Sequence, residues 1–280
     1  KISKYIKVGL IKKFFTVFNY SKFGYKAVAI ILLKFAKPKY TIEFYEKLEK
    51  DKFWISKGLV NNKYDLFIQG VFKSEEEINK YVFNLIEKNN EIISDYLIIK
   101  PYFVELYPLK FLGKTGGSFV MLEQGKGINL DEKDKKILKI LQDNGRVKLV
   151  EIANKTGISA ELALYKIKKL QNEKAILGSR IWFDMEKLGY FYSIVVIDLK
   201  NFSEKNQKKL KEFANDSKYV NSIIFSYNKP HCFIQLFHKE NTELVKAIEE
   251  LKNRFEDEAI ELDVILLKNE GEEINALPFY

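Results

Sequence analysis

Hydrophobic and polar positions follow the same order of patterns twice along the chain. Each stretch contains an apolar, β-branched run, an amphipathic pattern of helical period, two runs of strand type, a second helical pattern and a final apolar run. The first set predicts elements at residues 26–35, 41–50, 53–60, 66–72, 74–88 and 96–104, and the second at 193–199, 204–215, 220–227, 232–237, 242–255 and 260–267. The order β-α-β-β-α-β is that of a ferredoxin-like α+β sandwich. Helices cover only one face of such a sheet, so we expect the two sheets to pack face to face.

An ungapped comparison indicates an internal repeat. Residues 1–25 and 166–190 are identical at eight positions, where chance would give about one or two. Farther along, the tripeptide Phe-Ile-Gln at 67–69 recurs at 233–235. The sequence therefore predicts a tandem duplication of one ancestral unit.

A different pattern separates the two copies. Asp131 begins a helix that Gly145 is expected to end, and a short second helix leads through Gly157 to a third helix capped by Ser159. The inward positions are all apolar and comprise Ile137, Leu138, Leu141, Leu149, Ile152, Ala153, Ala163, Ile167 and Leu170. This arrangement predicts a helix-turn-helix, with residues 176–183 as its strand or wing.

The glycines suggest where the copies are joined. Five of the 14 glycines fall between residues 113 and 127, which is typical of a linker. We expect six segments, namely the tail of a first helix-turn-helix whose earlier helices are absent (1–24), a first ferredoxin-like domain (25–112), a Gly-rich linker (113–128), a winged helix-turn-helix (129–188), a second ferredoxin-like domain (189–270) and a tail (271–280).

Charge permits contact with nucleic acid. The 280-residue chain has a formal net charge of +9, and all but three of its 47 basic residues are lysine. Lysine attracts phosphate as a point charge but is less suited than arginine to bidentate readout of guanine. The same charge also fits a lysine-rich solubilising surface.

Several other classes of function lack support in the sequence. A single cysteine, Cys232, excludes an intrachain disulfide and a thiolate zinc cage, and it favours a reducing cytoplasm. The longest apolar runs, such as 27–33, are far shorter than the roughly 20 residues that span a membrane. His231 and His238 are expected on opposite faces of one strand, and no phosphate loop, nucleophile elbow or zinc-ligand spacing occurs. We therefore expect no catalytic residues, metal, cofactor or membrane contact.

The central module resembles the leucine-responsive/asparagine-type (Lrp/AsnC) family of transcriptional regulators. The resemblance rests on ordered, spaced matches over about 60 positions, at 130–134, 137–138, 141, 144–146, 152–153, 157–159, 167–170, 176 and 187–190. It implies a regulator that binds double-stranded DNA, forms homo-oligomers through ferredoxin-like sensing domains and responds to amino acids or similar small effectors. With two sensing domains in one chain, we expect them to pair internally as a pseudo-dimer.

The resemblance also implies which residues contact DNA. The third helix of the head is expected to enter the major groove, and its candidate contacts, with one preceding basic residue, are Arg146, Ser159, Leu162, Tyr165, Lys166, Lys168 and Lys169. Glu161, Leu162 and Leu164 depart from the hydroxyl, basic or amide residues usual in such regulators. A degenerate head that serves as a protein adaptor therefore remains an alternative.

The turns between the second and third strands of each unit are the candidate effector sites, again by resemblance. The corresponding residues are Asn61, Asn62 and Asp65 in the first copy and Asn228 and His231 in the second. The alternative is that both turns are simple hairpin connections.

An enzyme remains a less favoured alternative. Siroheme decarboxylases resemble the same family, and their tetrapyrrole chemistry requires basic residues, often with histidine, around a large cavity. This chain contains two histidines and three arginines. We therefore expect a regulator and not an enzyme.

Overall fold

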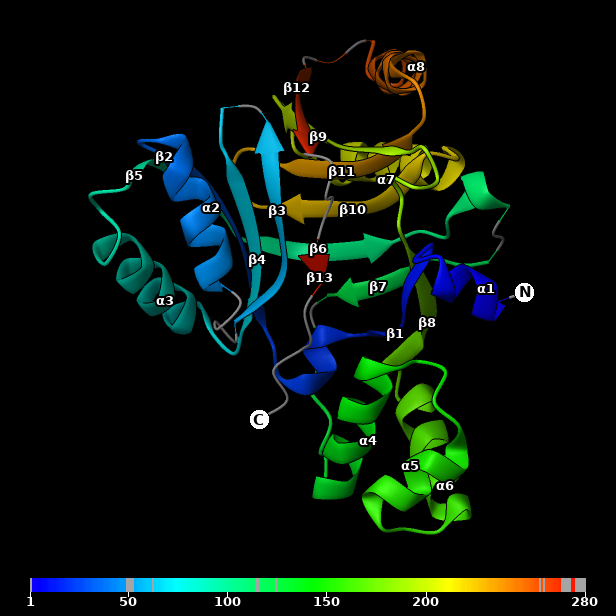
Figure 1. Ribbon diagram of the computed structural model, residues 1–280. Coiled ribbons are helices and arrows are strands. Elements are labelled where there is room, and N and C mark those ends of the chain that lie inside the picture. The colour runs from blue at the N-terminus through cyan, green and yellow to red at the C-terminus, as the bar shows by residue number, and fades with distance from the viewer. Residues whose placement is uncertain are drawn as a thin grey trace.

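The computed structural model describes residues 2–48, 53–61, 63–113, 116–123, 125–256, 258 and 260–267, together with the backbone of 273–274. Within these residues the chain forms two ferredoxin-like units and a three-helix head (Figure 1). The predicted α+β class, with a winged helix-turn-helix and a tandem pair of ferredoxin-like units, is confirmed.

The first ferredoxin-like unit extends from β2 to β5. Its elements are β2 (Ala27–Phe35), α2 (Pro38–Lys47), β3 (Trp54–Asn61), β4 (Leu66–Phe72), α3 (Glu75–Glu87) and β5 (Ile93–Ile99). The strands pair antiparallel in the order β5-β2-β4-β3. Ile31 and Leu33 alternate with residues of the opposite face and are buried with Phe44 of α2 and Ile78 of α3. The opposite face of β2, with Ile30 and Leu32, is buried as well, which explains why the strand is apolar on both faces.

The second unit repeats this arrangement. Its elements are β9 (Phe191–Leu199), α7 (Glu204–Asp216), β10 (Val220–Ser226), β11 (Cys232–His238), α8 (Asn241–Asn253) and β12 (Ile260–Leu267). The strand order β12-β9-β11-β10 is that of the first unit, position for position. Val195 and Ile197 of β9 are buried with Leu210 and Phe213 of α7 and Leu251 of α8.

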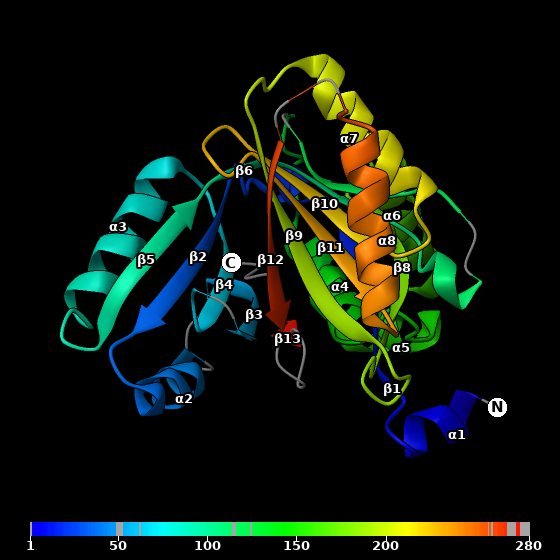
Figure 2. The same ribbon diagram turned by 90° about the horizontal axis from the view of Figure 1, so that it is seen from above.

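The inner faces of the two sheets pack against each other. Figure 2 shows α2 and α3 on one outer side of the molecule and α7 and α8 on the opposite side, with the strands between them. Ile30, Leu32 and Phe67 of the first unit belong to one buried cluster with Ile194 and Phe233 of the second. Apolar burial between the sheets thus supplies the cover that the helices leave missing.

The two units also exchange strands at their edges. β6 (Pro101–Leu106) directly follows β5 but pairs with β10 of the second unit. β13 (Glu273–Ile274) follows β12 and pairs with β3 of the first unit. β3 has the same position in the first unit as β10 has in the second. β12 itself also pairs with β3, through Leu266 opposite Asn61 and Leu267 opposite Val60. Together these pairings join both units into one 11-stranded sheet.

This exchange corrects two expectations from the sequence. The strand predicted at 96–104 is two strands, because the chain passes at Lys100 from β5 of the first unit to β6, which pairs with β10 of the second. A change of pairing partner leaves no signal in the hydrophobic periodicity. The segment predicted as a linker contains β7 (Phe119–Leu122), which pairs with β6. Its glycines therefore flank a short strand.

A pair of strands outside this sheet carries the head. α1 (Ile2–Lys7) leads into β1 (Ile11–Phe18), which pairs antiparallel with β8 (Ile176–Phe183). Ile11 lies opposite Phe183 and Phe18 opposite Ile176. In the repeat Ile11 corresponds to Ile176 and Phe18 to Phe183, so the two strands are related by a local twofold axis. The wing strand of the head therefore pairs with the strand that the sequence comparison aligns with it.

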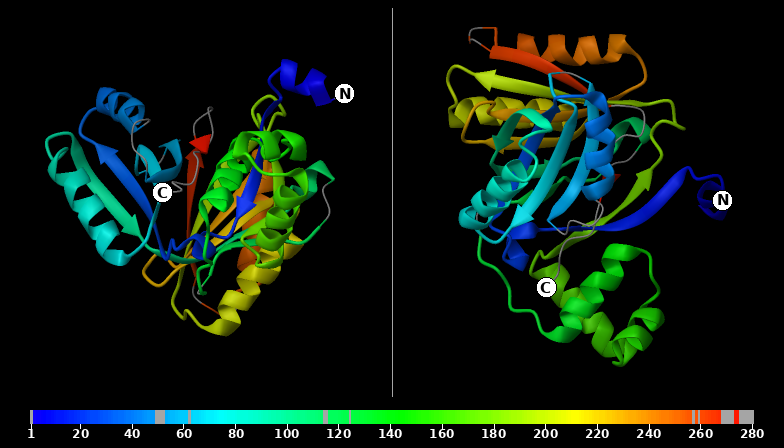
Figure 3. Two further views of the ribbon diagram at one scale, coloured as in Figure 1. Left: turned by 90° about the horizontal axis from the view of Figure 1, so that it is seen from below. Right: turned by 60° about the vertical axis from the view of Figure 1, so that its left-hand side comes forward.

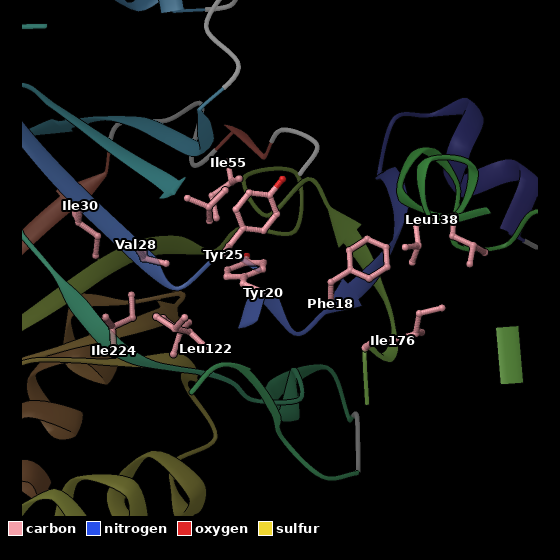
Figure 4. Close-up of a cluster of buried hydrophobic side chains, with 14 of the residues drawn as sticks. Phe18, Tyr20, Tyr25, Val28, Ile30, Ile55, Leu122, Leu138, Ile176 and Ile224 are labelled. Atoms are coloured by element: carbon pink, nitrogen blue, oxygen red, sulfur yellow. The ribbon is translucent and has the colours of Figure 1, made fainter. Parts of the chain in front are cut away.

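The head consists of α4 (Glu132–Asp143), α5 (Leu149–Thr156) and α6 (Ala160–Asn172). It stands apart from both pairs of outer helices (Figure 3). Asp131 and Asp134 form a capping box at the start of α4, and Gly157 ends α5 with a left-handed φ of 66°. Leu138 packs in the cluster that continues through Phe18 and Ile176 toward the sheets (Figure 4).

Gly145 has a different role from the predicted helix stop. α4 ends at Asp143 with Asn144 as its C-cap, and the Gly145 amide donates to the Phe14 carbonyl of β1 at 2.9 Å. A Cβ at Gly145 would lie 3.0 Å from the carbonyl carbon of Phe15. A side chain here would therefore push β1 and the head a few tenths of an ångström apart, and glycine allows their close approach.

Candidate functional site

The outward face of α6 carries side chains of mixed chemistry. The exposed residues are Glu161, Leu162, Leu164, Tyr165, Lys168 and Lys169. Leu162 is 42% exposed, Leu164 41% and Tyr165 65%, so three large apolar or aromatic side chains lie close together on this helix. Ser159 is occupied as the N-cap, since its Oγ accepts from the Leu162 amide at 3.2 Å. Four of the predicted DNA contacts, Leu162, Tyr165, Lys168 and Lys169, therefore lie together on one exposed face.

Lys166, also predicted to contact DNA, points toward the body of the head. Its Nζ lies 2.5 Å from Asp131 and 3.0 Å from Asp134, and its side chain is 13% exposed. The hydrogen bond from Lys166 is the main cause that lowers the pKa of Asp131 to about 2. Lys166 therefore ties the middle of α6 to the start of α4 and is not presented to a phosphate.

Arg146 lies exposed at the edge of the head, beside the paired strands. Its guanidinium stacks 4.9 Å from the ring centroid of Phe14 on β1. This contact leaves the planar N–H groups near solvent, where they can reach a phosphate. Arg146 and the exposed face of α6 form the candidate nucleic-acid interface.

The turns predicted to bind an effector close the ends of strands. Asp65 Oδ2 accepts from the Phe35 amide at 2.9 Å, and its Oδ1 receives Lys34 Nζ at 2.9 Å. In the second unit His231 Nδ1 lies 3.3 Å from the amide nitrogen of Leu199, which is the equivalent of Phe35, and 2.6 Å from Asp198 Oδ1. Asp65 and His231 thus hold equivalent places.

The other three predicted effector residues are dispersed. Asn61 lies opposite Leu266 where β3 pairs with β12. Asn228 is exposed, and its backbone amide donates to Ser226 Oγ at 3.3 Å. Asn62 lies outside the described residues. None of the four described candidates borders the large cavity that the structure contains.

That cavity has a volume of about 430 Å³ and lies between the strand pair β1–β8 and the inner faces of both units. Its aromatic walls include Phe15, Tyr20, Trp182, Phe183, Tyr190, Phe191, Tyr192 and Phe237. Its polar lining includes Lys12, Ser56, Gln69, Arg180, Asp184, Glu186, Asn221, Ser222 and Gln235. A concave, mostly apolar site with a few convergent polar groups is typical of small-molecule binding. No pattern in the sequence predicts this site, although Gln69 and Gln235 end the repeated Phe-Ile-Gln tripeptide.

Other chemistry is sparse in the part of the chain that the structure describes. No group of three or more His, Cys, Asp or Glu residues there could hold a metal ion. Cys232 is fully buried, which raises the pKa of its thiol. His238 is buried against Ser193 Oγ at 2.8 Å, and burial lowers the pKa of its imidazole. No described helix is both long and apolar enough to cross a membrane.

Comparison with known proteins agrees with the geometry of the head. Residues 130–176 match the family described as winged helix-turn-helix DNA-binding, so the head defines a winged helix-turn-helix protein. The chain is 39% identical over 119 residues to the HTH-type transcriptional regulator LrpA of Pyrococcus horikoshii. The match covers 42% of this chain and 83% of that protein. The chain therefore belongs to the Lrp/AsnC family of helix-turn-helix regulators.

Other relatives match over shorter parts of their length. The leucine-responsive regulatory protein of Rhizobium meliloti is 40% identical over 88 residues, or 31% of this chain and 54% of that protein. For regulatory protein AsnC of Haemophilus influenzae, the match is 33% identical and covers 30% of this chain and 59% of that protein. This chain thus spans little more than half the length of these two relatives.

A solved structure matches the fold along the whole chain. The crystal structure of the siroheme decarboxylase NirDL in complex with an iron-uroporphyrin III analogue has a TM-score of 0.70 and covers 100% of this chain and 83% of its own. The two sequences are 15% identical, so the likeness concerns the fold alone.

Proposed function

We propose that this protein is a DNA-binding transcriptional regulator whose α6 enters the major groove. The exposed face of α6 carries the proposal, because Lys168 and Lys169 form no ion pair with the described residues and flank the solvent-exposed Tyr165. These amines are positioned for phosphate contacts, and Leu162 for a thymine methyl. Arg146 adds a cation beside the wing strands.

Within this function, the two ferredoxin-like units act as a pseudo-dimer inside one chain. The reciprocal pairings of β6 with β10 and of β13 with β3, and the twofold register of β1 with β8, support this proposal. In a symmetric dimer such contacts would form between chains. They also support a tandem duplication, in which α1 and β1 correspond to the end of α6 and to β8. Family membership further suggests an amino acid or similar small effector and assembly into homo-oligomers.

A salt titration tests DNA binding. The affinity for a labelled duplex of mixed sequence should fall linearly on logarithmic axes as salt rises from about 50 to 200 mM, with a slope of about −0.9 for each phosphate neutralised. If Arg146, Lys168 and Lys169 each neutralise one phosphate, the slope is about −2.7 or steeper. Fluorescence anisotropy measures it. Absence of binding at about 50 mM salt would contradict the regulator and favour a protein adaptor that docks through Leu162 and Leu164.

A tetrapyrrole enzyme is a second candidate, favoured by the whole-chain fold likeness to a siroheme decarboxylase and by the large cavity. Against it, no histidine is among the described residues that line the cavity. Incubation with an iron tetrapyrrole followed by gel filtration separates the two functions. A Soret band that migrates with the protein would support the enzyme, and its absence the regulator.

A further inference from the structure

Two buried glutamines of the cavity have amide NH₂ groups without a partner among the described residues. Gln69 is 8% exposed and Gln235 is 7% exposed, and both line the cavity. Gln235 accepts two hydrogen bonds at Oε1, and neither its Nε2 nor the Gln69 carboxamide makes a hydrogen bond within the described residues. These atoms are not among the fully buried atoms without a partner, so they are accessible from the cavity, where a ligand or water can complete their hydrogen bonds.

The internal repeat brings these groups together. Gln69 and Gln235 end the two copies of the Phe-Ile-Gln tripeptide, on β4 and β11. Ser56 lies opposite Gln69 and Ser222 opposite Gln235, so each unit contributes one Ser-Gln pair to the same cavity. The two inner sheet faces must pack together for both Ser-Gln pairs to line one cavity.

A chain of hydrogen bonds fixes which atoms the second glutamine presents. Arg180 Nη2 donates to Asn221 Oδ1 at 2.6 Å, and a guanidinium has no acceptor, so this direction cannot reverse. Asn221 Nδ2 must then donate, and it does so to Gln235 Oε1 at 3.2 Å. Ser222 Oγ also donates to Gln235 Oε1. The Gln235 carboxamide is thereby locked with its NH₂ group as the part left for the cavity.

The donors of the cavity define the polar part of a ligand. Gln235 Nε2, Arg180 on β8 and Lys12 on β1 are all donors without acceptor capacity. Of the two acids that line the cavity, Asp184 has its own cation, Lys187 Nζ at 3.5 Å, and Glu186 is exposed to solvent. A group that only accepts hydrogen bonds, such as a carboxylate, matches this set.

The walls define the rest of the ligand. Lys12 Nζ lies 5.6 Å from the centroid of Trp182, and Tyr192 stacks on Phe237 at 4.8 Å. Tyr20, Ile55 and Ile224 also line the cavity, and the close-up shows Tyr20 near Ile55 (Figure 4). Flat aromatic rings bind well between such side chains.

We propose that this cavity binds a flat aromatic molecule that carries a carboxylate or an equivalent acceptor-only anion. The anion lies at Gln235 and Arg180, and the ring lies between Trp182 and the aromatic side chains of the second unit. The site is distinct from the α6 face and from the turns at Asp65 and His231. β8 follows α6 in the chain, so the ligand would contact the strand that carries the head.

The probe for this proposal is 1-anilinonaphthalene-8-sulfonate, an aromatic acceptor-only anion, with uncharged N-phenyl-1-naphthylamine as its matched control. The sulfonate should bind at one site, at least tenfold more tightly than the amine, and quench Trp182 by energy transfer. Gln235→Glu keeps the Oε1 acceptor but replaces the donor by a second anion, so sulfonate affinity should fall roughly tenfold to a hundredfold. Gln171→Glu, on exposed α6, adds the same charge outside the cavity and should leave affinity unchanged.

Trp182→Ala provides a readout that does not depend on the folding of the glutamine variant. Trp182 lines the cavity and is only partly buried, so the fold should persist while sulfonate affinity falls roughly tenfold with the loss of the aromatic wall. Equal binding of the two probes, equal affinity of folded Gln235→Glu and wild type, or unchanged affinity of Trp182→Ala would each overturn the proposal. No DNA is present in these titrations, so their failure leaves the DNA-binding proposal standing, and the reverse also holds.

Discussion

Replacement of both Lys168 and Lys169 by glutamate should lower the affinity for duplex DNA roughly a hundredfold at about 0.1 M salt. The double variant removes two phosphate contacts and brings two carboxylates toward the polyanion, so attraction is lost and repulsion is added. Both side chains are exposed on α6 and lie outside the ion pairs of the head, so the fold should be unaffected. Anisotropy titration of a labelled duplex measures the change.

The matched control has the same change of net charge on a distant helix. Lys205→Glu with Lys208→Glu alters two exposed lysines of α7, outside the head. This variant should lose only a few-fold in affinity, through the screened long-range field. Equal losses of DNA affinity in the two double variants would mean that binding depends on the overall charge of the protein and that α6 does not form the interface.

Phe213→Ala should destabilise the second ferredoxin-like unit by about 3–5 kcal/mol, because truncation leaves a cavity beneath the sheet. Phe213 of α7 is 1% exposed and packs in the outer core of that unit. The same substitution at Phe83 of α3, which is 65% exposed, should change the stability by no more than about 0.5 kcal/mol.

Urea unfolding followed by circular dichroism compares the two variants, and a clear shift of the midpoint is expected for Phe213→Ala alone. Similar midpoints for both variants would contradict the assignment of α7 to a buried outer layer. A large shift for Phe83→Ala would instead mean that the exposed side of α3 is covered in solution.

Local patterns predicted most of the secondary structure, because they depend on neighbours in sequence. Asp131 and Ser159 cap helices as their side chains predict, and Gly157 adopts the left-handed conformation that ends α5. The eight identities between residues 1–25 and 166–190 correspond to β1 and β8 with the residues beside them. The sequence alone therefore predicts that β1 and β8 correspond, without knowledge of how they pair.

Features that depend on packing between distant segments could not be predicted. Lys166 has the sequence context of a phosphate contact, and only the position of α4 brings Asp131 and Asp134 to its amine. Gly145 resembles a helix stop until β1 is known to pass behind it. The cavity needs Gln69, Gln235 and Arg180 from three strands, and the single signal in the sequence was the repeated tripeptide.

The central claim is that one chain supplies both partners of a paired-sheet regulator, and an engineered cross-link tests it directly. Asn61 and Leu266 lie opposite each other where β3 of the first unit meets β12 of the second, and both are exposed. Opposed residues of antiparallel strands bring their Cβ atoms within about 5 Å, close to the reach of a disulfide. Cys232 is fully buried and can remain in the chain.

Oxidised Asn61→Cys/Leu266→Cys protein should run on a non-reducing gel as a cross-linked single chain of 32.9 kDa, at every protein concentration. Each single-cysteine variant should remain uncross-linked. A band at twice that mass in the double variant, growing with protein concentration and replacing the intrachain product, would contradict the claim, because the two units would then pair only between separate chains.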